Sequence, residues 1–209
     1  VIDSFIGAHP DVRVELTLTD AVLDLMEDRY DLALRMGHVS DPRLASRLLM
    51  RGKRHVCASP GYWARQGRPK EPHDLIDHNC MVLARAGMPF AEWPFEKNGR
   101  LFGVRVRGDR LANDGAVLRG WAIAGAGVVL KSSFDIEHDL RAGVLETVLD
   151  DAVPKGSDLY AVWAPRRGND VRVARFVDYL ARMLDEPQSV RQKEHVDRHN
   201  SHNRKDAVT

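Results

Sequence analysis

Residues 12–37 read VRVELTLTDAVLDLMEDRYDLALRMG, in which two apolar stretches flank an amphipathic one. Apolar and polar residues alternate over residues 12–18, which predicts a strand with one packed face. Asp20 is a suitable N-cap for the short helix that follows, and the apolar run in residues 30–37 predicts a buried strand. Strand, helix and strand in this order form a βαβ unit with parallel neighbouring strands, so the stretch predicts an α/β fold.

The same alternation of strands and helices continues to residue 185. A helix is predicted over residues 1–8, ended by Pro10, and Asn98-Gly99 between two apolar runs predicts a hairpin turn. Alternating strands and helices predict a largely parallel sheet. The further predicted strands are 53–59, 78–83, 128–130, 144–149 and 159–164, and the further predicted helices run from Ser59 to Gly67, from Asn113 to Gly125, from Ser132 to Gly143 and over 170–185.

Composition narrows the class of protein. The 209 residues are 44% hydrophobic and 29% charged, enough for one domain of two lobes. With 31 Lys and Arg against 30 Asp and Glu, the formal charge of +1 shows no basic excess of the kind that an independent nucleic-acid binder carries. Two cysteines are too few for a disulfide scaffold. The absence of an apolar run of about 18 residues, and of a signal-peptide pattern at residues 1–11, favours a cytoplasmic protein.

Arg35 and Gly37 stand at the end of the second predicted strand. In α/β sheets, ligands bind outside the carboxyl ends of strands. A guanidinium there can hold a ligand carboxylate through two hydrogen bonds, and a glycine lets the backbone approach. The alternative is that Arg35 forms a structural ion pair with Asp31 or Asp41.

Other strand-to-helix loops supply further candidate contacts for a small ligand. Met88 and Phe90 can form an apolar wall, whereas Asp20 would disfavour an anion. For Asp20, Asn113 and Ser132 the alternative is plain helix capping. The complete set of predicted effector-binding residues is Thr19, Asp20, Arg35, Gly37, Met88, Phe90, Asn113, Asp114 and Ser132.

Motifs for catalysis or cofactors are not found. GAGVVL at residues 125–130 has the glycines after a helix and before a strand, the reverse of the dinucleotide fingerprint. His195, His199 and His202 lie in a polar tail without carboxylate support, so no metal site is predicted. There is no G-x-S-x-G elbow. We therefore expect neither enzymatic activity nor a cofactor.

Several long stretches together carry a family resemblance. They include LASRLLMRGKRHVCASPGYWARQGRPKEPHDLIDHNCMVL (44–83), NDGAVLRGWAIAGAGVVL (113–130) and LYAVWAPRRGNDVRVARFVDYLARML (159–184). From residue 1 to about 186 the chain resembles the effector-binding domain of LysR-type transcriptional regulators. The resemblance implies a periplasmic-binding-protein-like fold, with two Rossmann-like lobes joined by two crossover strands near 54–58 and 160–164.

The resemblance also implies the division of the chain. Lobe 1 would comprise residues 1–55 and 165–186, without the family's first strand, and lobe 2 residues 56–164. Residues 187–209 are polar and aperiodic, which predicts a disordered tail.

The implied function is to sense a small-molecule effector between the lobes. The implied assembly is a homodimer or tetramer that contacts DNA only through a helix-turn-helix domain not in this chain. A stand-alone solute-binding protein of the same fold is the alternative, and an enzyme on the same scaffold is a third hypothesis.

Overall fold

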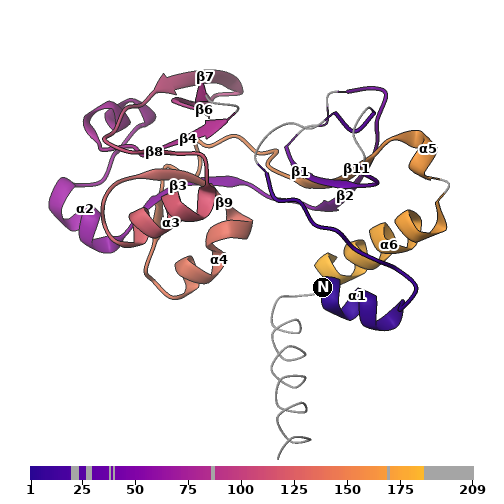
Figure 1. Ribbon diagram of the computed structural model, residues 1–209. Coiled ribbons are helices and arrows are strands. Elements are labelled where there is room, and N and C mark those ends of the chain that lie inside the picture. Colours follow the sequence, from indigo (N-terminus) through magenta and orange to yellow (C-terminus); the bar gives the residue numbers. More distant parts are fainter. Residues whose placement is uncertain are drawn as a thin grey trace, which may run out of the picture. The chain divides into compact units, whose positions relative to one another are not determined.

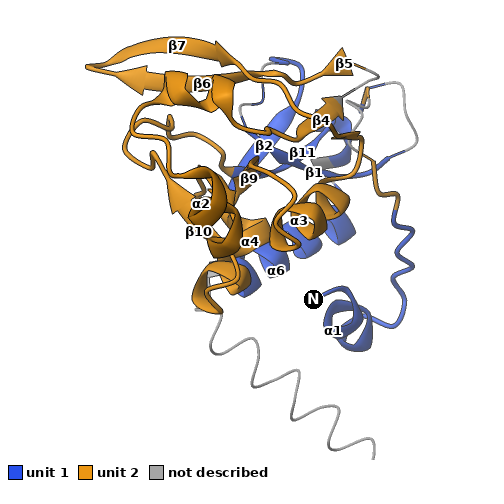
Figure 2. Ribbon diagram, turned by 90° about the vertical axis from the view of Figure 1, so that its left-hand side faces the viewer, with its two compact units in different colours: residues 1–16, 25–50, 159–209 blue, residues 17–24, 51–158 orange. Residues whose placement is uncertain are grey.

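The computed structural model describes residues 1–19, 24–26, 30–37, 39, 41–85, 88–168 and 170–185. The chain divides into two compact units, shown in Figure 2. Unit 1 comprises Val1–Leu16, Leu25–Met50 and Leu159–Thr209, and unit 2 comprises Thr17–Asp24 and Arg51–Asp158. The chain therefore passes into unit 2 after Met50 and returns to unit 1 after Asp158.

Unit 1 is a three-stranded sheet with a long helix on one face (Figure 1). β11 lies between β1 and β2 and is antiparallel to both. Apolar residues spaced three and four apart on α6 bury Val173, Val177 and Leu180 against Leu49 and Ala161 of the sheet. The elements are α1 (Ile2–Ala8), β1 (Ala33–Met36), β2 (Ala45–Met50), β11 (Leu159–Trp163), α5 (Pro165–Gly168) and α6 (Val171–Asp185).

Helix α1 packs on α6 through a single aromatic residue. Phe5 is 1% exposed, and its ring centroid lies 4.7 Å from that of Phe176 and 5.2 Å from that of Tyr179. Aromatic pairs at this spacing contribute beyond the area they bury. This contact holds α1 against unit 1.

Unit 2 contains three small sheets. In one, β3 lies between β10 and β9 and is antiparallel to both, and in another β4 is parallel to β8 and antiparallel to β5. The third sheet is the β6–β7 hairpin. The elements are β3 (Arg54–Ala58), α2 (Pro60–Gln66), η1 (Pro72–Asp77), β4 (Val82–Arg85), β5 (Met88–Pro89), β6 (Glu92–Lys97), β7 (Arg100–Arg105), β8 (Leu111–Ala112), α3 (Gly115–Ile123), β9 (Val129–Ser132), α4 (Ser133–Arg141) and β10 (Glu146–Val148).

Two apolar clusters form the core of unit 2. The first cluster contains the aromatic residues of α2 and of the β6–β7 hairpin, and in it Trp93 is 1% exposed and Phe95 is 0% exposed. The other joins α3 and α4 to the strands through Leu118, Ile136 and Met81. The second cluster positions the first turns of α3 and α4, where candidate site residues lie.

Most predicted elements are confirmed. Four of the five helices predicted with a cap or a stop residue form within a few residues of the expected positions: α1, α2, α3 and α4. The hairpin is also confirmed, since Asn98 (φ 53°) and Gly99 (φ 75°) have the two positive φ angles of a type I′ turn. Helix α6 follows its predicted range closely.

The βαβ prediction for residues 12–37 is wrong. Residues 12–19 have no regular secondary structure, and Leu16 and Leu18 are 63% and 85% exposed. A strand needs backbone partners, and no described strand pairs with this segment. β1 does form, but it pairs antiparallel with β11 instead. The helix predicted after Asp20 lies largely outside the described residues.

The prediction of a largely parallel sheet is also wrong for the described strands. Parallel pairing is confined to β4 with β8 and to an isolated bridge between Cys80 and Val128. The reason is topological: β3 follows the crossing after Met50 and β11 the crossing after Asp158, and each lies between two strands that run opposite to it.

The predicted tail, residues 187–209, lies outside the described residues. None of the helices in the described part of the chain has the length and apolar character needed to cross a membrane.

Candidate functional site

The ends of three strands meet at one edge of unit 2. β4 and β8 are parallel, with Leu83 opposite Ala112, so their carboxyl ends lie side by side. Lys131, near the end of β9, donates a hydrogen bond from Nζ to the carbonyl oxygen of Gly115, at 3.0 Å. Because Gly115 begins α3 directly after β8, this bond brings the end of β9 to the same edge.

A hollow lies between β4 and β9, where the two strands diverge. Just before these strands, Cys80 and Val128 form a parallel bridge. Further along β4, the carbonyl of Leu83 accepts instead from the N–H of Phe90, at 2.8 Å. The hollow has a volume of about 30 Å³, close to that of one water molecule, so unit 2 by itself provides a wall rather than an enclosed pocket. It is lined by Arg54, Met81, Leu83, Phe90, Trp93, Leu118 and Leu130.

Two cations lie at this edge in different settings. The guanidinium carbon of Arg54 is 5.8 Å from the centroid of the Phe90 ring, a cation–π arrangement. The Lys131 side chain is only 8% exposed and forms an ion pair with Asp135 at 2.8 Å. Arg54 therefore lines the hollow beside Phe90, whereas Lys131 is paired with Asp135 of α4.

Gly115 leaves room for the lysine side chain at the start of α3. A Cβ added at Gly115 would lie 2.8 Å from Lys131 Nζ, closer than such atoms approach. The absence of a side chain at Gly115 thus permits the hydrogen bond that joins β9 to α3.

Two of the predicted residues of unit 2, Asp114 and Ser132, are helix caps. Asp114 Oδ1 accepts from the N–H groups of Ala116 (2.6 Å) and Val117 (3.1 Å). Ser132 Oγ accepts from the N–H of Phe134 at 3.4 Å. The capping alternative is thereby confirmed for Ser132, and the carboxylate of Asp114 already occupies the first amides of α3.

The other two predicted residues of this loop region lie at the surface. The alternative that Asn113 is a cap is wrong, because the neighbouring Asp114 fills that place and Asn113 is exposed. Met88 on β5 is 72% exposed. Whether either residue contacts a ligand stays a prediction.

In unit 1, Arg35 lies on β1 opposite Tyr160 of β11 and is half-buried. Its charge helps to lower the pKa of Asp41 to about 2, although hydrogen bonds from Arg43 are the main cause. Asp31 instead forms an ion pair with Arg167 at 3.2 Å. The charge of Arg35 thus reaches Asp41, and the alternative of a structural ion pair for Arg35 stays a prediction.

The remaining predicted residues are Gly37, Thr19 and Asp20. Gly37 has a φ of +85°, which favours glycine, and an added Cβ would meet no atom within 4 Å. Thr19 is exposed in the segment without regular structure, and Asp20 lies outside the described residues.

Sequence reasoning missed Arg54 as a site residue. Its position at the start of β3 resembles that of any strand-end arginine, and its approach to Phe90 spans residues far apart in the chain. A second hollow, of about 130 Å³, was also missed; it lies in unit 1 under an ion pair between Arg47 and Asp178. It is lined by Arg47, Trp163, Val173, Ala174, Val177 and Asp178.

The reactive residue types are held in unreactive settings. Burial raises the pKa of Cys57 and of Cys80 to about 12, so neither thiol ionises near neutral pH. Within the described ranges, no group of three or more His, Cys, Asp or Glu side chains is arranged to hold a metal ion. At the described edge, Arg54 offers charge and hydrogen bonds, and Leu83, Phe90 and Leu118 offer apolar contact.

Comparison with known proteins identifies the class of domain. Residues 1–185 match the family model described as "LysR substrate binding domain". The HTH-type transcriptional regulator DmlR of Escherichia coli (strain K12) is 28% identical over 179 residues, which cover 86% of this chain and 58% of that protein. The chain thus spans little more than half of that relative.

Solved structures agree with this match. The regulatory domain of CrgA, a LysR-type transcriptional regulator from Neisseria meningitidis, aligns with a TM-score of 0.75 at 27% identity, covering 88% of this chain and 89% of that one. The regulatory domain of AphB from Vibrio vulnificus aligns with a TM-score of 0.66 at 26% identity, covering 86% and 87%.

Proposed function

The chain belongs to the LysR substrate-binding domain family, and on that premise we propose that it is the effector-sensing, dimerising domain of a bacterial LysR-type transcriptional regulator. We propose that units 1 and 2 are its two lobes. DNA contact would belong to the helix-turn-helix of the complete regulator, which would act in the cytoplasm as a dimer or tetramer. An effector would shift the equilibrium between conformations by its difference in affinity for them.

For unit 2 we propose that the wall formed by the ends of β4, β8 and β9 contacts a small carboxylate with an apolar body. The observation that carries this proposal is the placement of the Arg54 guanidinium over Phe90 at the hollow. The guanidinium suits a carboxylate, and Leu83 and Leu118 suit an apolar group. The amides of α3 would contribute little, because Asp114 already accepts from them.

For unit 1 we propose that Arg35 is a second contact for the effector. It is half-buried near the end of β1, and its guanidinium suits a carboxylate as that of Arg54 does. In the complete regulator, Arg35→Ala should weaken the response to effector with little loss of fold. A collapse of the melting temperature with an unchanged response per folded molecule would assign Arg35 a structural role.

Thermal unfolding with matched probes tests the ligand class. Benzoate is compared with benzamide, and succinate with succinamide, because each pair differs in charge but little in shape. At ten times its Kd a ligand stabilises by about 1.4 kcal/mol, which for a chain of this size raises Tm by about 3–6 °C. We expect at least one carboxylate to raise Tm more than its amide does.

Two arginine substitutions test whether the difference in Tm shift between carboxylate and amide depends on Arg54. Arg54→Gln should remove the difference between carboxylate and amide, whereas Arg100→Gln, at an exposed position of the hairpin, should leave it intact. Equal shifts for carboxylates and amides would exclude the proposed ligand class. If both variants lose the difference equally, Arg54 does not contact the ligand.

A further inference from the structure

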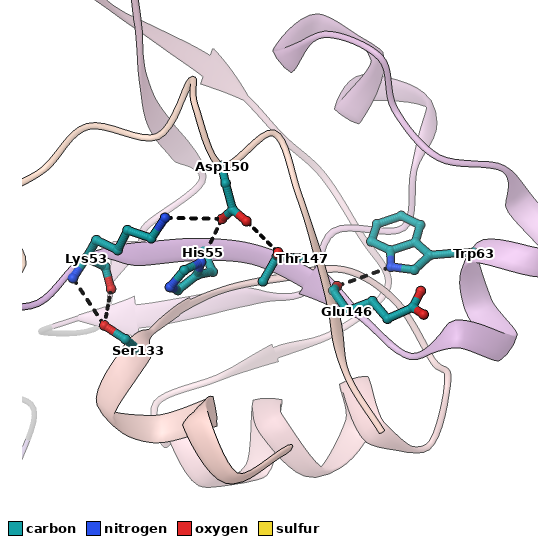
Figure 3. A network of polar contacts seen from close by, with 7 residues as sticks. All are labelled: Lys53, His55, Trp63, Ser133, Glu146, Thr147 and Asp150. Atoms are coloured by element: carbon teal, nitrogen blue, oxygen red, sulfur yellow. Dashed lines mark hydrogen bonds and ion pairs between the residues drawn. The ribbon is translucent and has the colours of Figure 1, made fainter. Parts of the chain in front are cut away.

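The first turn of α4 holds the main chain of Lys53 from both sides. Ser133 Oγ accepts a hydrogen bond from the N–H of Lys53 at 3.1 Å and donates one to the carbonyl of Lys53 at 3.0 Å. The backbone N–H of Ser133 donates a further bond to the same carbonyl, at 2.9 Å. One residue therefore satisfies both backbone polar groups of Lys53 (Figure 3).

Lys53 lies in the segment by which the chain enters unit 2 after Met50. This segment is hydrogen-bonded to the segment by which the chain leaves unit 2 after Asp158. Lys53 forms an antiparallel bridge with Lys155, and the N–H of Ser157 bonds to the carbonyl of Gly52 at 3.2 Å. The N–H of Gly52 bonds to Asp158 Oδ1 at 3.0 Å. We refer to residues 51–53 and 155–158 as the crossing segments.

Packing leaves the crossing segments little freedom beside α4. A Cβ added at Gly52 would lie 2.6 Å from both Phe134 Cζ and the carbonyl oxygen of Ser157. Phe134 thus packs against Gly52, while Ser133 forms hydrogen bonds with Lys53. Two consecutive residues of α4 define where the crossing segments run.

A second element holds the side chain of Lys53. Asp150 Oδ1 lies 3.9 Å from Lys53 Nζ and 2.6 Å from His55 Nδ1, and Thr147 donates to the other carboxylate oxygen (Figure 3). Asp150 follows Leu149, whose φ of +58° is unusual for a bulky residue and must be held by its surroundings. The main chain and the side chain of Lys53 are thereby held by different parts of unit 2.

We infer that Ser133 is the positioning residue through which unit 2 fixes the direction of both crossing segments. Its hydroxyl forms two of the three hydrogen bonds between Ser133 and the main chain of Lys53, and the crossing segments are bonded to each other. Ser132 and Lys131, at the proposed ligand wall, directly precede it in the chain. A shift of the first turn of α4 is therefore passed to the crossing segments. Only the step in which a ligand at this wall moves α4 rests on the proposed function.

Distances between two spin labels within unit 2, one of them on a crossing segment, test the inference without an effector. Lys155→Cys on a crossing segment and Gly120→Cys on α3 provide exposed attachment points. Cys57 and Cys80 are buried and remain unlabelled in the folded chain. In the otherwise unaltered chain we expect one narrow distribution of distances, and Ser133→Ala should lose this narrow peak and give a broad distribution.

Ser59→Ala is the matched control. Ser59 is a buried N-cap of α2 in the same unit, and its Oγ accepts from the N–H of Tyr62 at 3.3 Å. This variant loses a cap without touching the crossing segments, so the narrow peak should remain. An unchanged peak in Ser133→Ala, or equal broadening in Ser59→Ala, would overturn the inference.

Hydrogen exchange on the unaltered chain keeps the inference testable if Ser133→Ala does not fold. The amides of Gly52, Lys53 and Ser157 should exchange as slowly as those of β3. Exchange as fast as that of residues 13–18, which have no regular secondary structure, would show that the crossing segments are not held and would also overturn the inference.

Discussion

Lys131 Nζ lies 3.0 Å from the carbonyl oxygen of Gly115, and this bond joins the end of β9 to the start of α3. The first turn of α3 also carries Asp114, and β9 ends at the cap of α4. One buried ammonium group thus joins the loop of Asp114 to the end of β9 that carries Ser132. Its removal should affect both the stability and the geometry of that edge.

Lys131→Met should lower the free energy of unfolding by about 1–3 kcal/mol, because the carbonyl of Gly115 loses a charged donor in a part-buried site. Lys97→Met, at an exposed position of the hairpin, should change it by less than about 0.5 kcal/mol. Urea unfolding measures both. Equal values for the two variants would show that the bond contributes nothing to stability.

Arg119→Leu should destabilise the chain by about 3 kcal/mol, since it leaves the carboxylate of Asp139 buried without its partner. Asp139 is 2% exposed, and both its oxygens accept from Arg119 at 2.5 Å. Arg141→Leu breaks an exposed pair with Glu137 one turn away and should cost no more than about 0.5 kcal/mol. Denaturant midpoints of the two variants should therefore differ clearly, and similar midpoints would contradict the prediction.

Gly52→Ala should lower the free energy of unfolding by about 1–3 kcal/mol, because the added methyl group overlaps Phe134 and a backbone oxygen. Gly120→Ala is the control, since no atom lies within 4 Å of its Cβ position in α3. Helix propensity predicts that the control stabilises by up to about 1 kcal/mol. A neutral Gly52→Ala would show that the crossing segments adjust freely.

Acid should weaken the start of α6 through Asp170. Hydrogen bonds from the side chain and backbone of Arg172 lower the pKa of Asp170 from 3.8 to about 2. A lowered folded-state pKa means that the contribution is fully present above pH 3.8 and is lost as the pH falls through about 2. The stability difference between the unaltered chain and Asp170→Asn should be constant above that range and shrink below it. Unfolding in urea at a series of pH values measures this, and a difference that persists at pH 2 would contradict the assignment.

Part of the candidate site was predictable and part was not. Asp114 and Ser132 were identified because caps act on amides two or three residues away, which is a local relation. Arg54 was not identified, because its contact with Phe90 exists only after β3, β4 and β5 have taken their places. Gly115 and Lys131 meet for the same reason.

The amino-acid sequence alone determined the helices, their caps and the Asn98-Gly99 hairpin, because turn and capping energies depend on residues a few positions apart. Tertiary structure decided which strands pair and in which direction. Residues 12–18 alternate as a strand does, yet they remain unpaired, whereas β11 enters between β1 and β2 from the far end of the chain. A strand is stabilised by partners that may be more than a hundred residues away, so its own pattern permits pairing but does not select the partner.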